Sequence, residues 1–328
     1  MIVFLLGAGA SVDAGMPTVE VLTTELRDAL PNLRDENGKP RAEFREIFDV
    51  LATHDAEVLK NYERFFEWVD LIQKMQLPPF VGLVSWRLRP ELVSAAGALK
   101  FVIGSAIKGL LASRKTEPAY LARLADFAPR SGRLKVFSLN YDCCLEDACE
   151  AAGVYVTTGF DSKTGIWNPA LLAGKTRGIS LHKLHGSLRW YQLIRSPKRH
   201  VSGRCGILEL RPNGGRNCNP NLVRTPELVL GPANKIQPDD PFLHLFHSFL
   251  RSIERAKTCV LIGYGRRDSH VNAVLDQGIL AGASILDVNR GDPWCRYLAE
   301  KRYRHLRMRA KEALVGRALV TEVQRQGR

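Results

Sequence analysis

Two polar side chains follow apolar runs in a way that suits acid–base or ribose chemistry. Asn140 lies in Ser138-Leu139-Asn140-Tyr141-Asp142, and His185 lies in Leu184-His185-Gly186-Ser187. Histidine is the usual general base near neutral pH, and the glycine beside His185 would let a ligand come close. His182 precedes it by three residues, so in an extended segment the two rings face opposite sides and only one can enter a site. A structural histidine and ordinary strand-end turn residues are the plainer alternatives.

A glycine-rich turn, Gly7-Ala8-Gly9-Ala10-Ser11, directly follows the apolar run 2–6, and Gly15-Met16-Pro17 comes next. A buried strand that runs into closely spaced glycines and then a helix is typical of the phosphate-binding turn of dinucleotide folds. Glycine allows close approach there, and the helix N-terminus attracts anions. The usual third glycine is replaced by Val12, so a plain tight turn remains an alternative.

Two later apolar runs end in similar residues. Leu261-Ile262-Gly263-Tyr264-Gly265 is followed by Asp268, and Ile285-Leu286-Asp287-Val288 is followed by Asn289. Ligands of open α/β sheets bind at the carboxyl ends of the strands. These two runs therefore extend the candidate site.

The elements that must position these residues alternate between strands and helices. We predict strands at 2–6, 134–139, 154–158, 259–263 and 283–288, an extended segment at 179–193, and helices at 144–152, 241–256 and 271–280. This alternation predicts an α/β fold: a doubly wound, Rossmann-like parallel sheet with a helical insertion after the first strand–helix unit. The predicted domains are 1–30 with 129–291 for the sheet, 31–128 for the insertion, and 292–328 for a basic C-terminal helical segment.

Taken in order, these five motifs resemble the sirtuin family, and more closely its bacterial branch of NAD-cleaving antiphage-defence proteins. The resemblance spans residues 1–291, with the helical stretch as the family's variable insertion. It implies that NAD is the substrate and that His185 and Asn140 are the catalytic residues, His185 as the base. The NAD-binding residues that it implies are Gly7, Ala8, Gly9 and Ser11 at the pyrophosphate, Asp142 at the nicotinamide ribose, Gly263 along the adenosine half, Asn289 at the adenine ribose, and Pro17 and Tyr264.

The sequence departs from the protein-deacylating sirtuins in three places. The Phe-Arg that follows their Gly-Ile-Pro is replaced by Thr18-Val19. Their zinc module has two CxxC pairs, whereas Cys205 and Cys218 stand singly here. Two thiols do not complete a tetrahedral site even if His200 helps, so we expect no zinc and no other metal. The Phe-Gly-Glu strand that docks the acyl-lysine peptide is replaced by Leu228-Val-Leu-Gly-Pro-Ala233.

The positive charge of the chain is concentrated in two segments. Residues 194–224 and 295–328 contribute +6 and +7 of the net charge of +13. Such patches can meet nucleic acid, an acidic protein or an anionic cofactor, and a solvated basic surface is the alternative. Seven cysteines without a regular framework suit a reducing cytoplasm. Lys100 and Lys108 interrupt the apolar stretch 93–112, which argues against a membrane span.

The sequence therefore predicts an NAD glycohydrolase that yields nicotinamide and ADP-ribose, as a gated effector of antiphage defence in the cytoplasm. We expect a homo-oligomer or a separate regulatory protein, such as a HerA-like ATPase, to supply the gating. The alternatives are a protein deacylase or ADP-ribosyltransferase, and a non-catalytic module that binds NAD, ADP-ribose or nucleic acid.

Overall fold

The computed structural model describes residues 1–35, 37–74, 90–193, 206–210, 222–230, 240–297 and 299–327. The chain divides into two compact units. The sheet unit comprises Met1–Met16, Lys115–Val223 and Ile236–Arg328, and the helical unit comprises Pro17–Arg114 and Arg224–Lys235. This division differs from the predicted domains, because the first unit boundary falls after Met16 and the stretch Arg224–Lys235 joins the helices.

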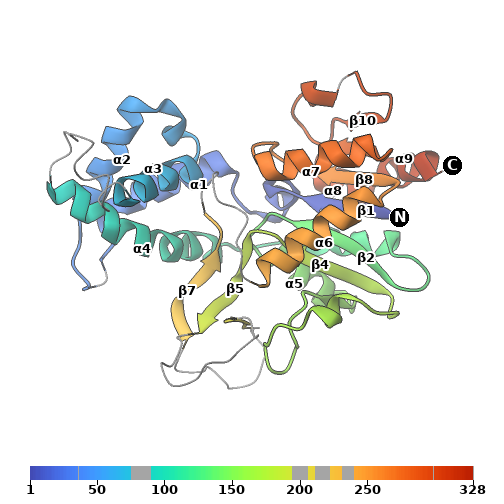
Figure 1. Cartoon of the computed structure of the whole chain (residues 1–328), viewed down its shortest axis with the longest axis horizontal. Coiled ribbons are helices and arrows are strands. Elements are labelled where there is room, and N and C mark those ends of the chain that lie inside the picture. Colours follow the sequence, from blue (N-terminus) through green and yellow to red (C-terminus); the bar gives the residue numbers. More distant parts are fainter. Residues whose placement is uncertain are drawn as a thin grey trace. The chain divides into compact units, whose positions relative to one another are not determined.

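A seven-stranded parallel sheet forms the centre of the sheet unit, in the order β10-β9-β8-β1-β2-β4-β3 (Figure 1). Its strands are β1 (Ile2–Leu6), β2 (Arg133–Ser138), β3 (Val156–Thr157), β4 (Gly178–Lys183), β8 (Thr258–Ile262), β9 (Ser284–Val288) and β10 (Tyr303–Leu306). Parallel strands buried on both faces read as continuous apolar runs, and β1 and β8 show this pattern. The predicted α/β fold with a Rossmann-like parallel sheet is confirmed.

Helices cover both faces of this sheet, since alternate side chains of a strand point to opposite faces. Phe4 and Leu6 of β1 belong to a core that also contains residues of α5 (Cys144–Ala151), α8 (Ala310–Val315) and α9 (Ala318–Gly327). On the other face, Phe137 of β2 contacts Phe249 of α6 (Phe242–Glu254), with ring centroids 4.9 Å apart. Helix α7 (Ser269–Leu280) packs on α6.

Three short strands lie outside the main sheet. β5 (Gly186–Leu193) pairs antiparallel with β6 (Ile207–Glu209), and β7 spans Leu222–Leu228. The predicted continuous extended segment 179–193 is thus two strands, β4 and β5, with a turn at Leu184-His185 between them. The residues before and after this turn therefore belong to two different sheets.

The glycine turn leads into short 3-10 helices and not directly into an α-helix. η1 (Ala8–Ala10) and η2 (Val12–Ala14) follow β1, and a longer 3-10 helix, η6 (Ala119–Phe127), packs beside them. The Tyr120 hydroxyl of η6 donates to the Ala10 carbonyl at 2.6 Å. Residues 115–127, predicted as part of the helical insertion, therefore belong to the sheet unit.

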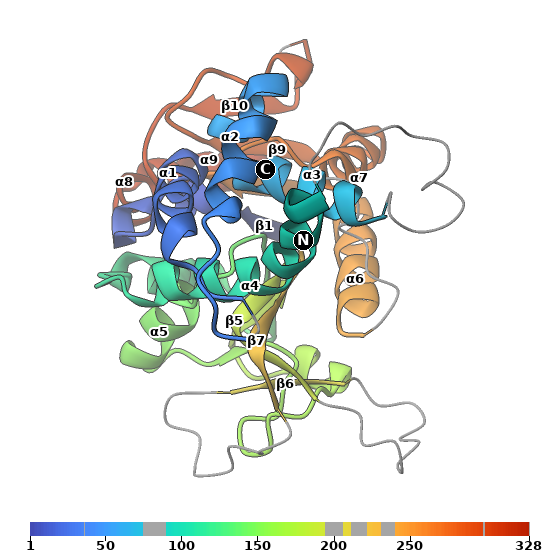
Figure 2. The same ribbon diagram turned by 90° about the vertical axis from the view of Figure 1, so that its left-hand side faces the viewer.

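Four α-helices make up the described part of the helical unit, drawn in blue and teal in Figure 2: α1 (Val19–Ala29), α2 (Glu43–His54), α3 (Tyr62–Lys74) and α4 (Pro90–Ala112). Helix α4 packs against the other three. Its buried residues recur at helical spacing: Leu92, Ala95, Ala96, Leu99, Ile103, Ile107 and Leu111.

Within α4, the stretch Glu91–Ala112 is long and apolar enough to cross a membrane. By length and composition, the prediction that Lys100 and Lys108 rule out a membrane span therefore fails. The buried core helix of a soluble protein meets the same criteria.

The C-terminal segment differs from the basic helical segment predicted at 292–328. It begins with strand β10, which pairs with β9 and extends the sheet by one strand. Apolar residues of the following helices then pack into the core, among them Leu314, Leu319 and Val323. These side chains stabilise the sheet unit itself, and the arginines between them remain at the surface.

Candidate active site

The predicted site residues follow strands whose carboxyl ends are in register. Leu6 pairs with both Ser138 and Ile262, and the pairing extends from Ser138 to Lys183 and from Ile262 to Val288. The residues that come directly after these five strand ends therefore form one row along one edge. This row holds the glycine turn, Asn140, His185, Gly263 and Asn289, as expected for a ligand site of an open α/β sheet.

The glycine turn fits closely against the turn that follows β8. The Gly7 and Gly9 amides donate to the carbonyls of Ile262 and Gly263, both at 3.0 Å. A Cβ at Gly9 would lie 2.7 Å from the Gly263 Cα, and one at Gly263 would lie 2.3 Å from the Ala10 amide nitrogen. Glycine is required at these positions because two backbones touch, and Gly263 also has a positive φ of 60°.

Most amides of this turn already have partners inside the protein. Besides Gly7 and Gly9, Ala10 donates to the Gly7 carbonyl and Ser11 to the Ala8 carbonyl. In this conformation these four amides are not free phosphate donors. Of the residues predicted at the pyrophosphate, Ala8 is the exposed one.

Asn140 joins the turn after β2 to the glycine turn. Its Nδ2 donates to the Gly7 carbonyl at 3.0 Å and to the Ser11 Oγ at 3.1 Å, and the side chain is 9% exposed. Both amide protons are used, so the acceptor Oδ1 is the remaining polar atom of the side chain. An acceptor held in this way suits a hydroxyl or a water molecule as its donor.

His185 lies in the turn between β4 and β5, which is bonded to the segment after β2. Leu184 donates to the Ser138 carbonyl at 2.9 Å, and Leu188 donates to the Tyr141 carbonyl at 3.0 Å. Gly186 has a φ of 89°, which allows the sharp reversal. The His185 Nε2 lies 3.0 Å from Asp268 Oδ2, and both side chains are buried.

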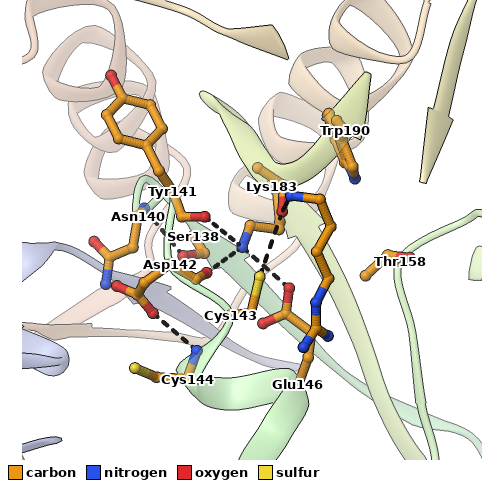
Figure 3. Close-up of polar contacts among 12 residues, drawn as sticks. Ser138, Asn140, Tyr141, Asp142, Cys143, Cys144, Glu146, Thr158, Lys183 and Trp190 are labelled. Atoms are coloured by element: carbon orange, nitrogen blue, oxygen red, sulfur yellow. Dashed lines mark hydrogen bonds and ion pairs between the residues drawn. The ribbon is translucent and has the colours of Figure 1, made fainter. Parts of the chain in front are cut away.

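A buried lysine, Lys183, contacts the backbone of the segment after β2, as Figure 3 shows. The Lys183 ammonium lies between Glu146, whose Oε1 is 3.0 Å away, and the backbone carbonyls of Tyr141 and Asp142. Burial by itself would lower the pKa of Lys183, but the Glu146 carboxylate raises it above its usual value. The charged lysine therefore fixes the backbone next to Asn140.

The model of the SIR2-like domain family matches residues 134–290. Residues 134–290 are therefore similar to a SIR2-like domain. A search of curated proteins gave no match. Among solved structures, similarity covers 99% of this chain and 92% of a Sir2 homologue mutant in complex with ADP-ribose, at 15% identity and a TM-score of 0.46. A Sir2 homologue–NAD complex is covered to 89% at 16% identity and a TM-score of 0.45, and Sir2 bound to acetylated peptide to 93% at 12% and 0.43. The fold assignment rests on this chain's own strand topology.

The matched region 134–290 contains six of the predicted site residues, and three of these, Asp142, Tyr264 and Asn289, have structural partners. Asp142 Oδ1 accepts from the Cys144 amide at 3.0 Å at the start of α5 (Figure 3). The hydroxyl of Tyr264, a buried residue, donates to Asn272 Oδ1 at 2.7 Å. Asn289 Nδ2 donates to the Tyr264 carbonyl at 3.0 Å and keeps a half-buried side chain. Pro17 is the first residue of the helical unit, so the geometry of the sheet unit does not include it.

His182 lies inside the matched region in a setting unlike that of His185. Its ring is 4.6 Å from that of Phe137 between centroids, and the residue is 1% exposed. Burial lowers the pKa of His182 to about 3, so the ring is neutral. The prediction that only one of the two histidines reaches the strand-end row agrees with this arrangement, although a turn and not strand alternation separates them.

Sequence reasoning gave no role to Asp268 or to the Lys183–Glu146 pair. Asp268 lies three residues before the predicted helix 271–280, and an aspartate near the start of a helix normally caps that helix. Lys183 in an apolar strand pattern was a signal of a buried charge that needs a partner. Cys205, Cys218 and His200, on which the zinc expectation depends, lie outside the described residues.

A cavity of about 330 Å³ lies beside α5. Its lining includes four acidic residues, Glu146, Glu150, Asp161 and Glu209. The lining contains none of the residues predicted to bind or cleave NAD, so this cavity is separate from the row of strand ends.

Proposed function

We propose that this protein cleaves NAD with water to give nicotinamide and ADP-ribose. The observation that carries the proposal is the row of strand ends in a sheet unit that contains the SIR2-like region, where Asn140 is tied to the glycine turn and His185 lies 3.0 Å from a carboxylate. An anchored acceptor and a base beside one edge of a parallel sheet are what hydrolysis of a bound dinucleotide needs.

The chemistry divides between these two side chains. The C1′–N bond of the nicotinamide ribose breaks, and nicotinamide leaves as a neutral molecule because the pyridinium charge takes up the bond's electron pair. The water oxygen forms the new bond to C1′, and its proton passes to His185 directly or through a ribose hydroxyl. The Asn140 Oδ1 accepts a hydrogen bond from that water or from a ribose hydroxyl and so fixes its position.

Water is the acceptor that the sequence favours over an acyl-lysine peptide. The Phe-Gly-Glu strand of protein deacylases is absent, and so is the Phe-Arg that follows their Gly-Ile-Pro, where this chain has Thr18-Val19. Of the stretch that replaces the peptide-docking strand, residues 228–230 are described, and Val229 is buried.

We further propose that the reaction is a gated effector step of antiphage defence in the cytoplasm, on the basis of the sequence resemblance. Uncontrolled NAD cleavage would harm the host, so an oligomer of this chain or a partner such as a HerA-like ATPase would control it. We also expect the purified protein to hold no stoichiometric zinc. Elemental analysis that finds one zinc per chain would contradict this expectation and favour a deacylase.

The test is incubation of the purified chain with NAD alone, with an acetylated peptide, and with a protein acceptor, each over a range of chain concentrations. Nicotinamide and free ADP-ribose in equal amounts without any acceptor support the proposal. Turnover that requires the peptide identifies a deacylase, and label that stays on protein identifies an ADP-ribosyltransferase. An absence of turnover at every chain concentration contradicts all three activities for the isolated chain and favours a binding module.

A further inference from the structure

Asp268 occupies the N-cap position of α7 but does not cap that helix. Aspartate is among the favoured N-cap residues because its carboxylate accepts from the first free amides of the helix. Here the backbone has the extended N-cap conformation, φ −95° and ψ 103°, yet the side chain makes no capping hydrogen bond. Its carboxylate lies beside His185 instead, so Asp268 contacts the histidine and does not cap α7.

The contact with His185 is buried on both sides. His185 is 5% exposed and Asp268 is 6% exposed, and Nε2 to Oδ2 is 3.0 Å. The contact has an ion-pair distance without hydrogen-bond alignment. A lone pair on Nε2 would repel a carboxylate oxygen 3.0 Å away, so the contact favours a proton on Nε2. In the neutral ring, Nδ1 then carries the lone pair and is the basic nitrogen.

Asp268 is itself held firmly. Its carbonyl accepts from the Asn272 amide at 2.9 Å and from the Tyr264 hydroxyl at 3.2 Å. Asn272 Nδ2 donates to the Arg266 carbonyl at 3.0 Å, which closes the loop between β8 and α7. The positive end of the α7 dipole favours the charged carboxylate. Through these contacts, the buried Tyr264 stabilises the loop that carries Asp268.

Other charged side chains near the site are directed elsewhere. Lys183 is paired with Glu146 under the loop after β2, and Asp142 accepts from the Cys144 amide. Arg266 pairs with the buried Asp287 at 2.5 Å. Among the described residues, Asp268 is the carboxylate at ion-pair distance from His185.

We propose that Asp268 is the positioning residue of the site: it holds His185 as the Nε2-protonated tautomer, with Nδ1 as the base. The claim about the reaction rests on the proposed NAD cleavage, whereas the claim about the tautomer does not. When Nδ1 takes the proton from water or from a ribose hydroxyl, the ring becomes an imidazolium. The Asp268 carboxylate then stabilises that cation without taking its proton.

The first test reads the histidine directly and needs no turnover. Nitrogen-15 labelled full-length protein is studied by NMR, and His185 is assigned by the signal lost in His185→Gln. We expect the Nε2-protonated tautomer in the wild type, and in Asp268→Asn a titration midpoint lowered by about one pH unit because the negative partner is gone. An Nδ1-protonated ring in the wild type, or an unchanged midpoint in the variant, overturns the inference whether or not the protein cleaves NAD.

The second test separates positioning from folding. Asp268→Asn should lower kcat by about 100-fold or more with KM for NAD within about threefold, and shift the acid limb of the rate profile to lower pH. Asp268→Glu should recover part of kcat because the charge returns. The matched control is Asp276→Asn on the same helix, which loses a carboxylate bonded to Arg296 and Tyr297 and should leave kcat and the pH profile unchanged.

A kcat of Asp268→Asn equal to that of the wild type, or an equal loss in Asp276→Asn, overturns the positioning role. If Asp268→Asn does not fold, the wild-type NMR spectrum and the pH profile of Asp268→Glu decide instead. A wild type with the expected tautomer and no NAD turnover would leave the pairing in place and remove only the proposed function.

Discussion

The body of β4 and the turn that follows it show how one residue type serves two purposes within three positions. His182 in the strand packs against the Phe137 ring, and burial lowers its pKa to about 3. His185 in the turn is equally buried, but it lies 3.0 Å from the Asp268 carboxylate. Burial alone therefore does not distinguish a structural histidine from a reactive one. The difference comes from the partner that a distant segment supplies.

The same contrast holds for the sheet as a whole. The bodies of β1 and β8 are mainly apolar and depend on packing, whereas the strand ends carry polar side chains that bond to neighbouring turns. Substitutions at strand ends should therefore affect activity most, and substitutions in strand bodies should affect stability.

Asn140→Ala should give the largest loss of activity at a strand end besides His185. Loss of the anchored acceptor should lower kcat/KM for NAD by roughly 100-fold or more. Unfolding should remain cooperative, because two hydrogen bonds to Gly7 and Ser11 contribute about 1 kcal/mol each. Initial rates and thermal unfolding measured on the same preparation check both points. Activity within threefold of the wild type would remove Asn140 from the site.

Gly263→Ala should give a large loss of stability, because its Cβ would lie 2.3 Å from Ala10 N and its φ of 60° disfavours a side chain. We expect the free energy of unfolding to fall by about 3 kcal/mol or more. Gly265→Ala is the matched control two residues later, where a Cβ would meet nothing within 4 Å. Denaturant titrations of the two variants compare them, and equal stabilities would contradict the close approach of the two turns.

The burial of His182 in the strand body predicts a pH effect on stability. Because the folded-state pKa of His182 is about 3 and its unfolded value is 6.5, the unfolded chain binds a proton between these values that the folded chain does not. Stability is therefore lost as the pH falls below about 6.5, by about 2–3 kcal/mol at pH 4.5. In His182→Leu, the free energy of unfolding should fall less on acidification, by about 2–3 kcal/mol at pH 4.5. Parallel slopes for the two proteins would show that His182 titrates normally.

The C-terminal segment should give the smallest effect on catalysis. Arg304 and Arg307 are more than half exposed, and the carboxylates of Glu322 and Asp292 lie 3.6 and 4.0 Å from them. Arg304→Glu with Arg307→Glu should leave NAD cleavage by the isolated chain within about twofold and shift the native mass or abolish binding of a partner. Arg309 is left unchanged because it pairs with Asp13 beside the glycine turn. Native mass spectrometry compares the double variant with the wild type and with Arg123→Glu as a control charge reversal. Unchanged assembly and partner binding in the double variant would disprove the interaction role.

The sequence predicted the sheet and the row of strand ends because both depend on local patterns. Continuous apolar runs marked β1, β8 and β9, and the glycines and asparagines after them marked the edge. Gly7 and Gly9 were predicted to allow close approach of a pyrophosphate, and the structure shows them in close contact with Gly263 instead.

Other features could not be predicted because their causes lie far apart in the chain. The contact between Asp268 and His185 joins residues 83 positions apart, and no periodicity indicates it. Strand β10 was hidden in a segment whose arginines suggested a helix, since an edge strand needs few apolar residues. The division after Met16 depends on packing between α1 and α4, which the amphipathic pattern of α1 alone does not reveal.

The most direct test of the central claim is the rate of nicotinamide release from NAD by His185→Gln and His182→Gln, measured beside the wild type. Both variants remove one buried imidazole from the same segment, so they control for each other. We predict that His182→Gln keeps at least about a tenth of the wild-type kcat, while His185→Gln loses at least about 1000-fold. Loss of activity in His182→Gln with activity retained in His185→Gln would contradict the assignment of His185 as the base.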